Sequence, residues 1–230
     1  MAFQPVVDIG ERRIVSYEAL VRGPGGEPAR SVLDQVIGET RYQFDQACRV
    51  RALELAAEAG LDRRLNINFL PNAVYEPKAC IRLTLATAER VGIPLDRITF
   101  EIVEDERIGD MPHLTGIIQE YRRHGFRIAL DDFGSGFAGL AVLNELSPDM
   151  VKLDMALIRG IHDDRRKRVI TLGMIAVCQT LGIEVVAEGV EAAAELDILG
   201  EAGVRLFQGY YFARPALGRL IADAEIVYPG

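Results

Sequence analysis

Short runs of consecutive apolar residues alternate along the chain with longer segments in which apolar residues recur at helical spacing. The short runs predict buried strands at residues 3–8, 14–21, 65–69, 98–103, 127–130, 150–154, 183–187 and 204–207. Turn residues separate most of these runs from the helical segments that follow them. About eight short strands, most of them separated by a helix, are typical of a parallel α/β barrel.

The helical segments are predicted from spacing and from their stop signals. Two helices are expected within residues 31–60, with Ser31 as a cap and Gly60 as the stop. Further helices are expected at residues 79–91, 110–124, 137–146, 164–181 and 192–202. The helix of residues 164–181 is expected to pack into the core through its apolar positions, which are Val169, Ile170, Leu172, Ile175, Ala176 and Leu181.

The first two strands change the topology. They are joined by a turn at Gly10 and Glu11, which predicts a hairpin and hence one strand that runs antiparallel. The predicted fold is therefore an α/β, modified TIM-like (β/α)8 barrel with one antiparallel strand. A doubly wound open sheet is the alternative, and it is less favoured because only a closed barrel brings the ends of all its strands to one mouth.

Polar side chains recur at the carboxyl ends of the predicted strands. Any one of these acids, taken alone, is more often a helix cap or a surface charge. The recurrence along the whole chain favours a shared pocket instead, formed by Glu18, Asn68, Glu101, Asp131, Asp132, Lys152, Glu188 and Gln208. Such an oxygen-rich donor set suits Mg²⁺ or Mn²⁺ better than Zn²⁺, and two ions would relieve the repulsion among the carboxylates. The chemistry it indicates is hydrolysis of a phosphate ester.

Composition sets the class of protein and excludes several functions. The 230 residues are 49% hydrophobic and 26% charged, with no Ser/Gly-rich or Pro-rich linker, so a single domain over residues 1–230 is expected. No apolar run is long enough to cross a membrane and no signal-peptide pattern is present, so we expect a cytoplasmic protein whose domain makes no membrane contact.

Charge and residue usage narrow the function further. The formal net charge of −8 argues against binding duplex nucleic acid through a basic face, and the run Arg165–Arg168 is interpreted as a solvated first helical turn. Three well-separated cysteines indicate neither a disulfide framework nor a zinc site. None of the three histidines ends a predicted strand, which argues against a His-based catalytic triad.

The spaced polar blocks resemble the signature of the EAL-domain family of bacterial cyclic-di-GMP phosphodiesterases, nearly along the whole chain. The blocks are Glu18-Ala19-Leu20-Val21-Arg22, Asn68, Glu101-Ile102-Val103-Glu104, Asp131-Asp132-Phe133-Gly134, Val151-Lys152-Leu153-Asp154, Ala187-Glu188-Gly189-Val190-Glu191 and Gln208-Gly209-Tyr210. The resemblance implies hydrolysis of cyclic di-GMP to linear pGpG with Mg²⁺ or Mn²⁺. Ca²⁺ is expected to be inhibitory, because its looser coordination geometry positions water poorly. The resemblance also implies a homodimer and regulation by a sensor domain, fused or separate.

The resemblance implies a role for each matching residue. One metal ion would be held by Glu18, Asn68, Glu101 and Asp131, and a second by Asp131, Asp132 and Glu188. The expected catalytic residues are Lys152, Glu188, Asp132 and Glu104, and the expected substrate contacts are Gln4, Arg22, Lys152 and Gln208. Glu104 and Glu191 are expected to support the metal ligands from behind, and Glu104 to steady the loop of residues 133–140.

Two loops depart from the commoner family pattern. Arg22 is followed by Gly23-Pro24-Gly25-Gly26, and the loop after the Asp pair reads Gly134-Ser135-Gly136-Phe137-Ala138-Gly139. Neither change removes an expected metal ligand. The alternative function is a catalytically silent cyclic-di-GMP receptor or protein-interaction module, and the presence of every expected acid favours the enzyme over it.

Overall fold

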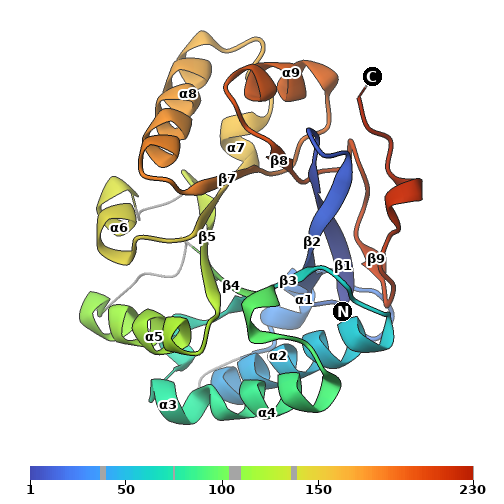
Figure 1. The fold of residues 1–230 in the computed structure, drawn as a ribbon, viewed down its shortest axis with the longest axis vertical. Helices are drawn as coiled ribbons and strands as arrows, with labels where there is room; N and C mark the ends of the chain where they lie inside the picture. The colour runs from blue at the N-terminus through green and yellow to red at the C-terminus, as the bar shows by residue number, and fades with distance from the viewer. Residues whose placement is uncertain (37–39, 75, 104–109, 136–138, 230) are drawn as a thin grey trace.

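The computed structural model describes residues 1–36, 40–74, 76–103, 110–135 and 139–229, and these residues form a closed barrel surrounded by helices (Figure 1). The barrel strands are β1 (Ala2–Asp8), β2 (Arg13–Leu20), β3 (Arg64–Phe69), β4 (Ile98–Val103), β5 (Arg127–Phe133), β6 (Met150–Leu153), β7 (Glu184–Ala187) and β8 (Leu206–Phe207). All eight predicted strands are thus present. The last is shorter than expected, because only two of its four predicted residues pair.

The topology confirms the barrel with one antiparallel strand. Strands β2 to β8 follow one another in parallel order, and β1 closes the barrel between β8 and β2, antiparallel to both. A further strand, β9 (Ala216–Leu217), pairs with the start of β1. It was not predicted because two residues carry no period that a sequence pattern can reveal.

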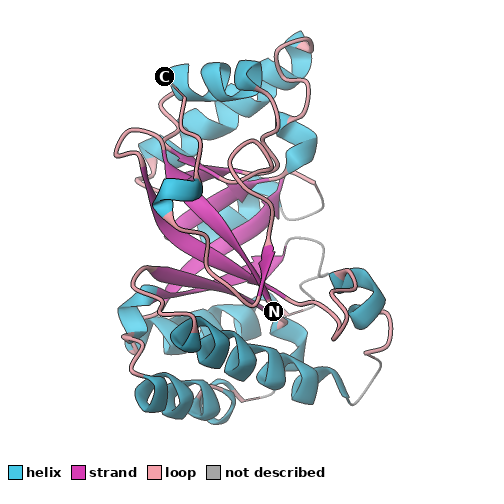
Figure 2. Cartoon of the chain, turned by 90° about the vertical axis from the view of Figure 1, so that its right-hand side faces the viewer, coloured by secondary structure: helices cyan, strands magenta, loops and turns pink. Residues whose placement is uncertain are grey.

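Helices cover the outside of the barrel on opposite sides (Figure 2). They are α1 (Ala29–Leu33), α2 (Thr40–Glu58), α3 (Pro77–Cys80), α4 (Arg82–Val91), α5 (Met111–Arg123), α6 (Gly139–Leu146), α7 (Met155–Ile158), α8 (Arg165–Thr180) and α9 (Ala193–Glu201). Three short 3₁₀ turns lie at Pro71–Ala73, Leu95–Arg97 and Asp223–Glu225. The two helices expected within residues 31–60 are therefore present as α1 and α2.

Two details of the helix prediction are wrong. Ser31 is not a cap, because α1 already begins at Ala29 and the Ser31 hydroxyl donates to the carbonyl of Pro28, the residue before the helix. The apolar positions of α8 do not all face the core: Val169, Ile170 and Leu181 are 64%, 55% and 60% exposed. The helix buries Thr171, Ile175 and Cys178, of which Ile175 was an expected position. The apolar residues of the helix therefore cover more of its circumference than the core accepts.

The barrel interior has an apolar layer beneath a polar one. Val6, Ala129, Met150 and Val186 form a small buried cluster inside the barrel. Side chains alternate along a strand, so the residues two positions further on point inward as well, one level nearer the carboxyl ends. Asp131 follows Ala129, Lys152 follows Met150 and Glu188 follows Val186 at this spacing. The alternation of side chains along the strands therefore places a ring of charged groups above the apolar cluster, nearer the carboxyl ends of the strands.

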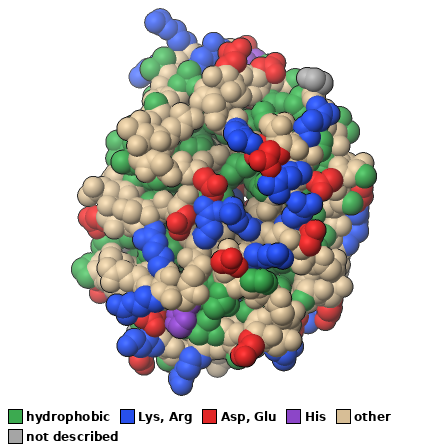
Figure 3. All heavy atoms as spheres, viewed as in Figure 1, with side chains coloured by type: hydrophobic (Ala, Val, Ile, Leu, Met, Phe, Trp, Pro, Cys, Tyr) green, Lys and Arg blue, Asp and Glu red, His purple; other side chains and the backbone are tan. Residues whose placement is uncertain are grey.

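The structure also describes helix length, surface charge and the cysteines. No helix among the described residues is both long enough and apolar enough to cross a lipid bilayer. Acidic and basic side chains are interspersed on the face drawn in Figure 3. Cys80 and Cys178 are buried free thiols, and Cys48 is half-buried.

Candidate functional site

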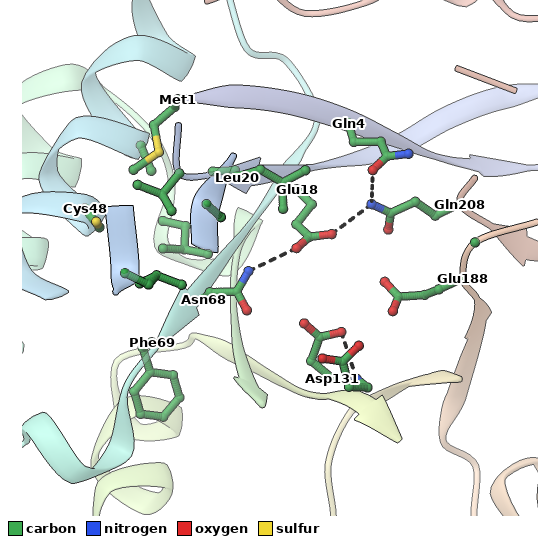
Figure 4. A pocket seen from close by; sticks show the side chains of 18 of the residues that line it. Met1, Gln4, Glu18, Leu20, Cys48, Asn68, Phe69, Asp131, Glu188 and Gln208 are labelled. Atoms are coloured by element: carbon green, nitrogen blue, oxygen red, sulfur yellow. Dashed lines mark hydrogen bonds between the residues drawn. The ribbon is translucent and has the colours of Figure 1, made fainter. Parts of the chain in front are cut away.

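The strand ends deliver their polar side chains to one place. Gln4 comes from β1, Glu18 from β2, Asn68 from β3, and Asp131, Glu188 and Gln208 from the opposite side of the mouth (Figure 4). They line one cavity of about 540 Å³. The structure therefore brings together residues that are up to about 200 positions apart in sequence, as the barrel prediction requires.

Lys152 is the centre of this arrangement. Its side chain is completely buried, and its Nζ lies 2.8 Å from Glu188 Oε1, 2.9 Å from Asp131 Oδ1, and 3.1 Å from an oxygen of Glu18 and of Glu101. One ammonium thus contacts four carboxylates. A buried charge is tolerated only when it is paired, so Lys152 and the acids hold each other in place.

Burial and mutual repulsion perturb the acids strongly. Burial, opposed in part by Lys152, raises the pKa of Glu101 and of Glu188 well above the ordinary value. Burial also raises the pKa of Asp131. Burial alone would lower the pKa of Lys152, but the surrounding carboxylates raise it well above its ordinary value. Lys152 therefore stays protonated, and Glu101, Asp131 and Glu188 retain their protons more readily than isolated carboxyl groups.

Glu18 differs from the other acids because amides surround it. Asn68 Nδ2 donates to Glu18 Oε1 at 3.0 Å, and Gln208 Nε2 donates to Glu18 Oε2 at 2.8 Å (Figure 4). Burial favours the protonated form, yet Lys152 and these two amides together hold the pKa of Glu18 below its ordinary value. Gln4 accepts from Gln208 at 3.2 Å and donates to the Ala213 carbonyl, which fixes the Gln208 amide.

The Asp131–Asp132 pair depends on a kink in β5. Asp132 has a φ of 53°, in the left-handed region that few residues other than glycine adopt, and the register of β5 shifts between Leu130 and Phe133. In a regular strand the two side chains would point to opposite faces. The Asp132 amide donates to Asp131 Oδ1 at 3.0 Å, and burial with the Asp131 charge raises the pKa of Asp132 to about 7.

Two overlapping groups of acids have the spacing of metal ligands. Glu18, Glu101 and Asp131 offer oxygens within 4.8 Å of one another, and so do Asp131, Asp132 and Glu188. Asp131 belongs to both. With all five acids ionised, Lys152 leaves a formal charge of −4, which two divalent cations would balance. The donors are oxygens, so the residues present fit hard cations such as Mg²⁺ or Mn²⁺.

The remaining expected site residues are Glu191, Arg22 and Glu104. Glu191 is at the rim of the cavity, where it forms a two-pronged ion pair with Arg159. Arg22 is half-buried and donates to the Val21 carbonyl at 2.7 Å, so its guanidinium is held by its own backbone. Glu104 lies outside the described residues.

Two residues of the site were missed in the sequence. Asn66 Nδ2 donates to Glu101 Oε1 at 2.9 Å, and Asn66 is almost completely buried. Its position two residues before Asn68 in β3 places both on the same strand face, which is the signal that could have found it. Arg159 donates to the Gly189 carbonyl at 2.7 Å, next to Glu188. Arg159 follows the four-residue helix α7, which no sequence pattern predicted.

Comparisons with known proteins identify what this arrangement resembles. A family model described as EAL domain matches residues 1–215. The chain is 30% identical over 217 residues to the blue light- and temperature-regulated antirepressor BluF of Escherichia coli, covering 94% of this chain and 54% of BluF. It is 31% identical over 226 residues to the cyclic di-GMP phosphodiesterase NbdA of Pseudomonas aeruginosa, covering 93% of this chain and 28% of NbdA. The chain thus spans about half or less of these curated relatives.

Solved structures are similar over nearly the whole chain. A standalone EAL protein of Vibrio cholerae with bound c-di-GMP is 48% identical, with a TM-score of 0.93 and coverage of 96% of this chain and 94% of that one. BlrP1 of Klebsiella pneumoniae in complex with manganese and c-di-GMP is 35% identical, with a TM-score of 0.89 and coverage of 94% and 56%. The same protein has also been solved with calcium and c-di-GMP.

Proposed function

The chain belongs to the EAL domain family, and from that premise we propose that it is a metal-dependent phosphodiesterase that hydrolyses cyclic di-GMP to linear pGpG. The observation that carries the proposal is the contact of Lys152 with four carboxylates at the barrel mouth. Five of the acids that the proposed reaction requires form the two metal-ligand groups of this site, and they are Glu18, Glu101, Asp131, Asp132 and Glu188. The c-di-GMP complexes of similar structures support the ligand.

The metal ligands would be Glu18, Asn68, Glu101 and Asp131 for one ion, and Asp131, Asp132 and Glu188 for the other. Bound Mg²⁺ or Mn²⁺ would supply Lewis acidity, lowering the pKa of water and offsetting the charge of the phosphodiester. The raised pKa values of Glu101, Asp131 and Glu188 mean that these acids would release protons as cations bind.

The chain's own groups would orient the reactants and manage protons. Lys152 is fixed by four carboxylates, so its ammonium would donate to a phosphate oxygen or orient the attacking water. Burial and the Asp131 charge raise the pKa of Asp132 to about 7 in the metal-free site, so Asp132 would release its proton near neutral pH as a cation binds. Gln208 already donates to Glu18 and would hold that carboxylate in position beside the substrate.

A regulatory role without turnover is the second candidate. The name of BluF, an antirepressor, favours it, since that relative is described by its regulatory effect. A receptor of this kind would bind cyclic di-GMP through the same pocket. The sequence contains every expected acid, and the five acids of the two metal-ligand groups lie together in the structure, which favours the enzyme.

We also propose a homodimer in the cytoplasm, under the control of a sensor domain. The exposed face of α8 supports the dimer, because Val169, Ile170, Val177 and Leu181 present apolar surface to solvent. BluF and NbdA are longer than the part that matches this chain, which supports a sensor domain in the same polypeptide as the matching domain.

The test is to incubate the purified protein with cyclic di-GMP and Mn²⁺ or Mg²⁺ and to separate the products by chromatography. We expect pGpG only when metal is present. Glu18→Ala should abolish the product while the circular dichroism spectrum stays unchanged, and Glu201→Ala, an exposed glutamate on α9, is the matched control. Binding of cyclic di-GMP without any product would favour the receptor, and full activity of Glu18→Ala would contradict the metal assignment.

A further inference from the structure

The segment of residues 188–191 begins with one of the proposed metal ligands. Glu188 is the first residue after β7, and its Oε1 lies 2.8 Å from Lys152 Nζ (Figure 4). It belongs to the metal-ligand group that also contains Asp131 and Asp132. A carboxylate just beyond the end of a strand keeps its place only if the backbone that follows it is held. The contacts of the 188–191 segment therefore decide where this ligand lies.

Two glycines let neighbouring segments approach the 188–191 segment closely. Gly189 has a φ of 63°, and a Cβ at this residue would lie 2.6 Å from Met155 Cβ at the start of α7. Gly209 lies on the opposite side, and a Cβ there would lie 2.1 Å from the Val190 carbonyl oxygen. A side chain at either glycine would force these segments apart. The 188–191 segment is therefore packed between α7 and the residues that follow β8.

Arg159, the residue directly after α7, binds the 188–191 segment with all three nitrogens of its guanidinium. Its Nε donates to the Gly189 carbonyl at 2.7 Å, and its Nη1 donates to Glu191 Oε2 at 2.7 Å. The Nη2 atom completes the ion pair with Glu191 Oε1. The guanidinium is rigid and planar, so one side chain fixes both a backbone carbonyl and a carboxylate of this segment.

A buried glutamate on α9 holds both ends of this connection. Glu195 is 3% exposed, and its Oε1 accepts from the amide of Gly160, the residue after Arg159, at 3.0 Å. Its Oε2 accepts from the amides of Glu191 at 3.0 Å and Ala192 at 3.2 Å. Glu195 thus ties the backbone beside Arg159 to the backbone of its ion-pair partner. The separation of the two partners is consequently fixed by a third group.

We propose that Arg159 is a positioning residue for Glu188, the ligand of the second metal ion. The inference rests on the proposed function, because Arg159 acts through a metal ligand that the proposed function assigns. Arg159 anchors the carbonyl of the residue next to Glu188, and so sets where the Glu188 carboxylate meets the cation that it would share with Asp131 and Asp132. Three ligands of the other ion come from β2, β3 and β4, so their placement does not depend on the 188–191 segment.

The test is a calorimetric titration of Mn²⁺ into the metal-free protein, without cyclic di-GMP. We expect two bound ions in the wild type. Arg159→Met keeps the stem and removes the guanidinium, so it should weaken one ion by about tenfold or more and leave the other within about twofold of the wild type. Arg219→Met is the matched control, because Arg219 donates to both oxygens of Glu225 on the surface, and its loss should leave both affinities unchanged.

Arg159→Lys keeps the result decisive if Arg159→Met fails to fold. A lysine ammonium preserves the charge but does not reproduce the planar fork, so the same ion should be weakened, by less than in Arg159→Met. Unchanged affinities in the Arg159 variants, or equal weakening of both ions, would overturn the inference.

The outcomes also separate this inference from the proposed function. A wild type that binds a single ion would contradict the two-ion site and this inference with it. Selective loss of one ion in the Arg159 variants, in a protein that does not hydrolyse cyclic di-GMP, would support the inference and contradict the proposed function alone.

Discussion

Arg49 offers a quantitative test of how buried charge supports this barrel. Its side chain is completely buried on α2, with Asp45 at 2.6 Å and the Tyr121 hydroxyl at 2.8 Å. Its guanidinium also lies 5.2 to 5.8 Å from the ring centroids of Phe69, Phe100 and Tyr121. Replacement by methionine keeps an apolar stem of similar length and removes only the charged head.

The magnitude follows from what the replacement leaves behind. Charges 2.6 Å apart attract by about 6 kcal/mol at an effective dielectric constant of about 20, and the desolvation of both ions offsets much of this. Removing one partner of a buried pair leaves the other uncompensated, at a cost of about 3 to 5 kcal/mol. We therefore expect Arg49→Met to lower the free energy of unfolding by about that amount, measured by urea denaturation at pH 7.

The sign of the pH dependence supplies a second check. Burial, opposed by Arg49, already raises the pKa of Asp45. A carboxyl whose folded pKa is raised stabilises the fold at low pH and loses that contribution as pH rises through the folded pKa. Without Arg49 the pKa of Asp45 rises further, so the deficit of Arg49→Met should be smaller at pH 5 than at pH 8.

Two comparisons complete the experiment. Asp45→Asn combined with Arg49→Met should recover part of the loss, because no buried charge then remains while the Leu70 amide keeps an acceptor. Arg90→Met breaks the exposed pair with Glu54 and should cost less than about 1 kcal/mol. A cost of Arg49→Met as small as that of Arg90→Met, or a deficit that grows at low pH, would refute the reasoning.

The remaining predictions concern the site and the surface. Because the pKa of Asp132 is about 7, Mn²⁺ affinity measured by calorimetry should rise from pH 6 to pH 8 as metal displaces fewer protons, and a flat profile would argue against Asp132 as a ligand. Ca²⁺ should bind but support little turnover, since its looser geometry positions water poorly; rapid hydrolysis with Ca²⁺ alone would contradict the mechanism. Ile170→Glu should shift the protein toward monomer in light scattering, with Arg166→Glu as a polar control on the same helix, and an unchanged mass would exclude this face of α8 from a dimer.

The sequence was most informative where one residue type recurs at one structural position. Acids and amides at the ends of successive strands predicted the barrel mouth, and Glu18, Asn68 and Glu188 lie there because strand ends converge in a closed barrel. The roles assigned to them stay predictions. What the pattern could not predict is that Lys152 contacts four acids at once, since that depends on side-chain reach across the barrel.

Other features could not be predicted because they contradict local preference. Arg49 lies in a helix among charged neighbours and is ordinarily interpreted as a solvated side chain, yet tertiary packing buries it completely. In α8 the opposite occurred, because Val169 and Ile170 have the pattern of core residues but face solvent. In both cases the sequence shows the polarity of a side chain, and the arrangement of neighbouring elements decides which surroundings it meets.

The alternation along β2 has a consequence for how this chain can evolve. Residue 18 faces carboxylates and an ammonium, whereas residue 19, one peptide away, is buried in the apolar core together with residues 52 and 67. Adjacent codons are therefore selected for opposite properties. A substitution at residue 19 that packs well in the core is still selected against if it shifts the carboxylate of residue 18. Among relatives, we expect volume changes at residues 19, 52 and 67 to be inherited together, while residues 18 and 68 stay fixed.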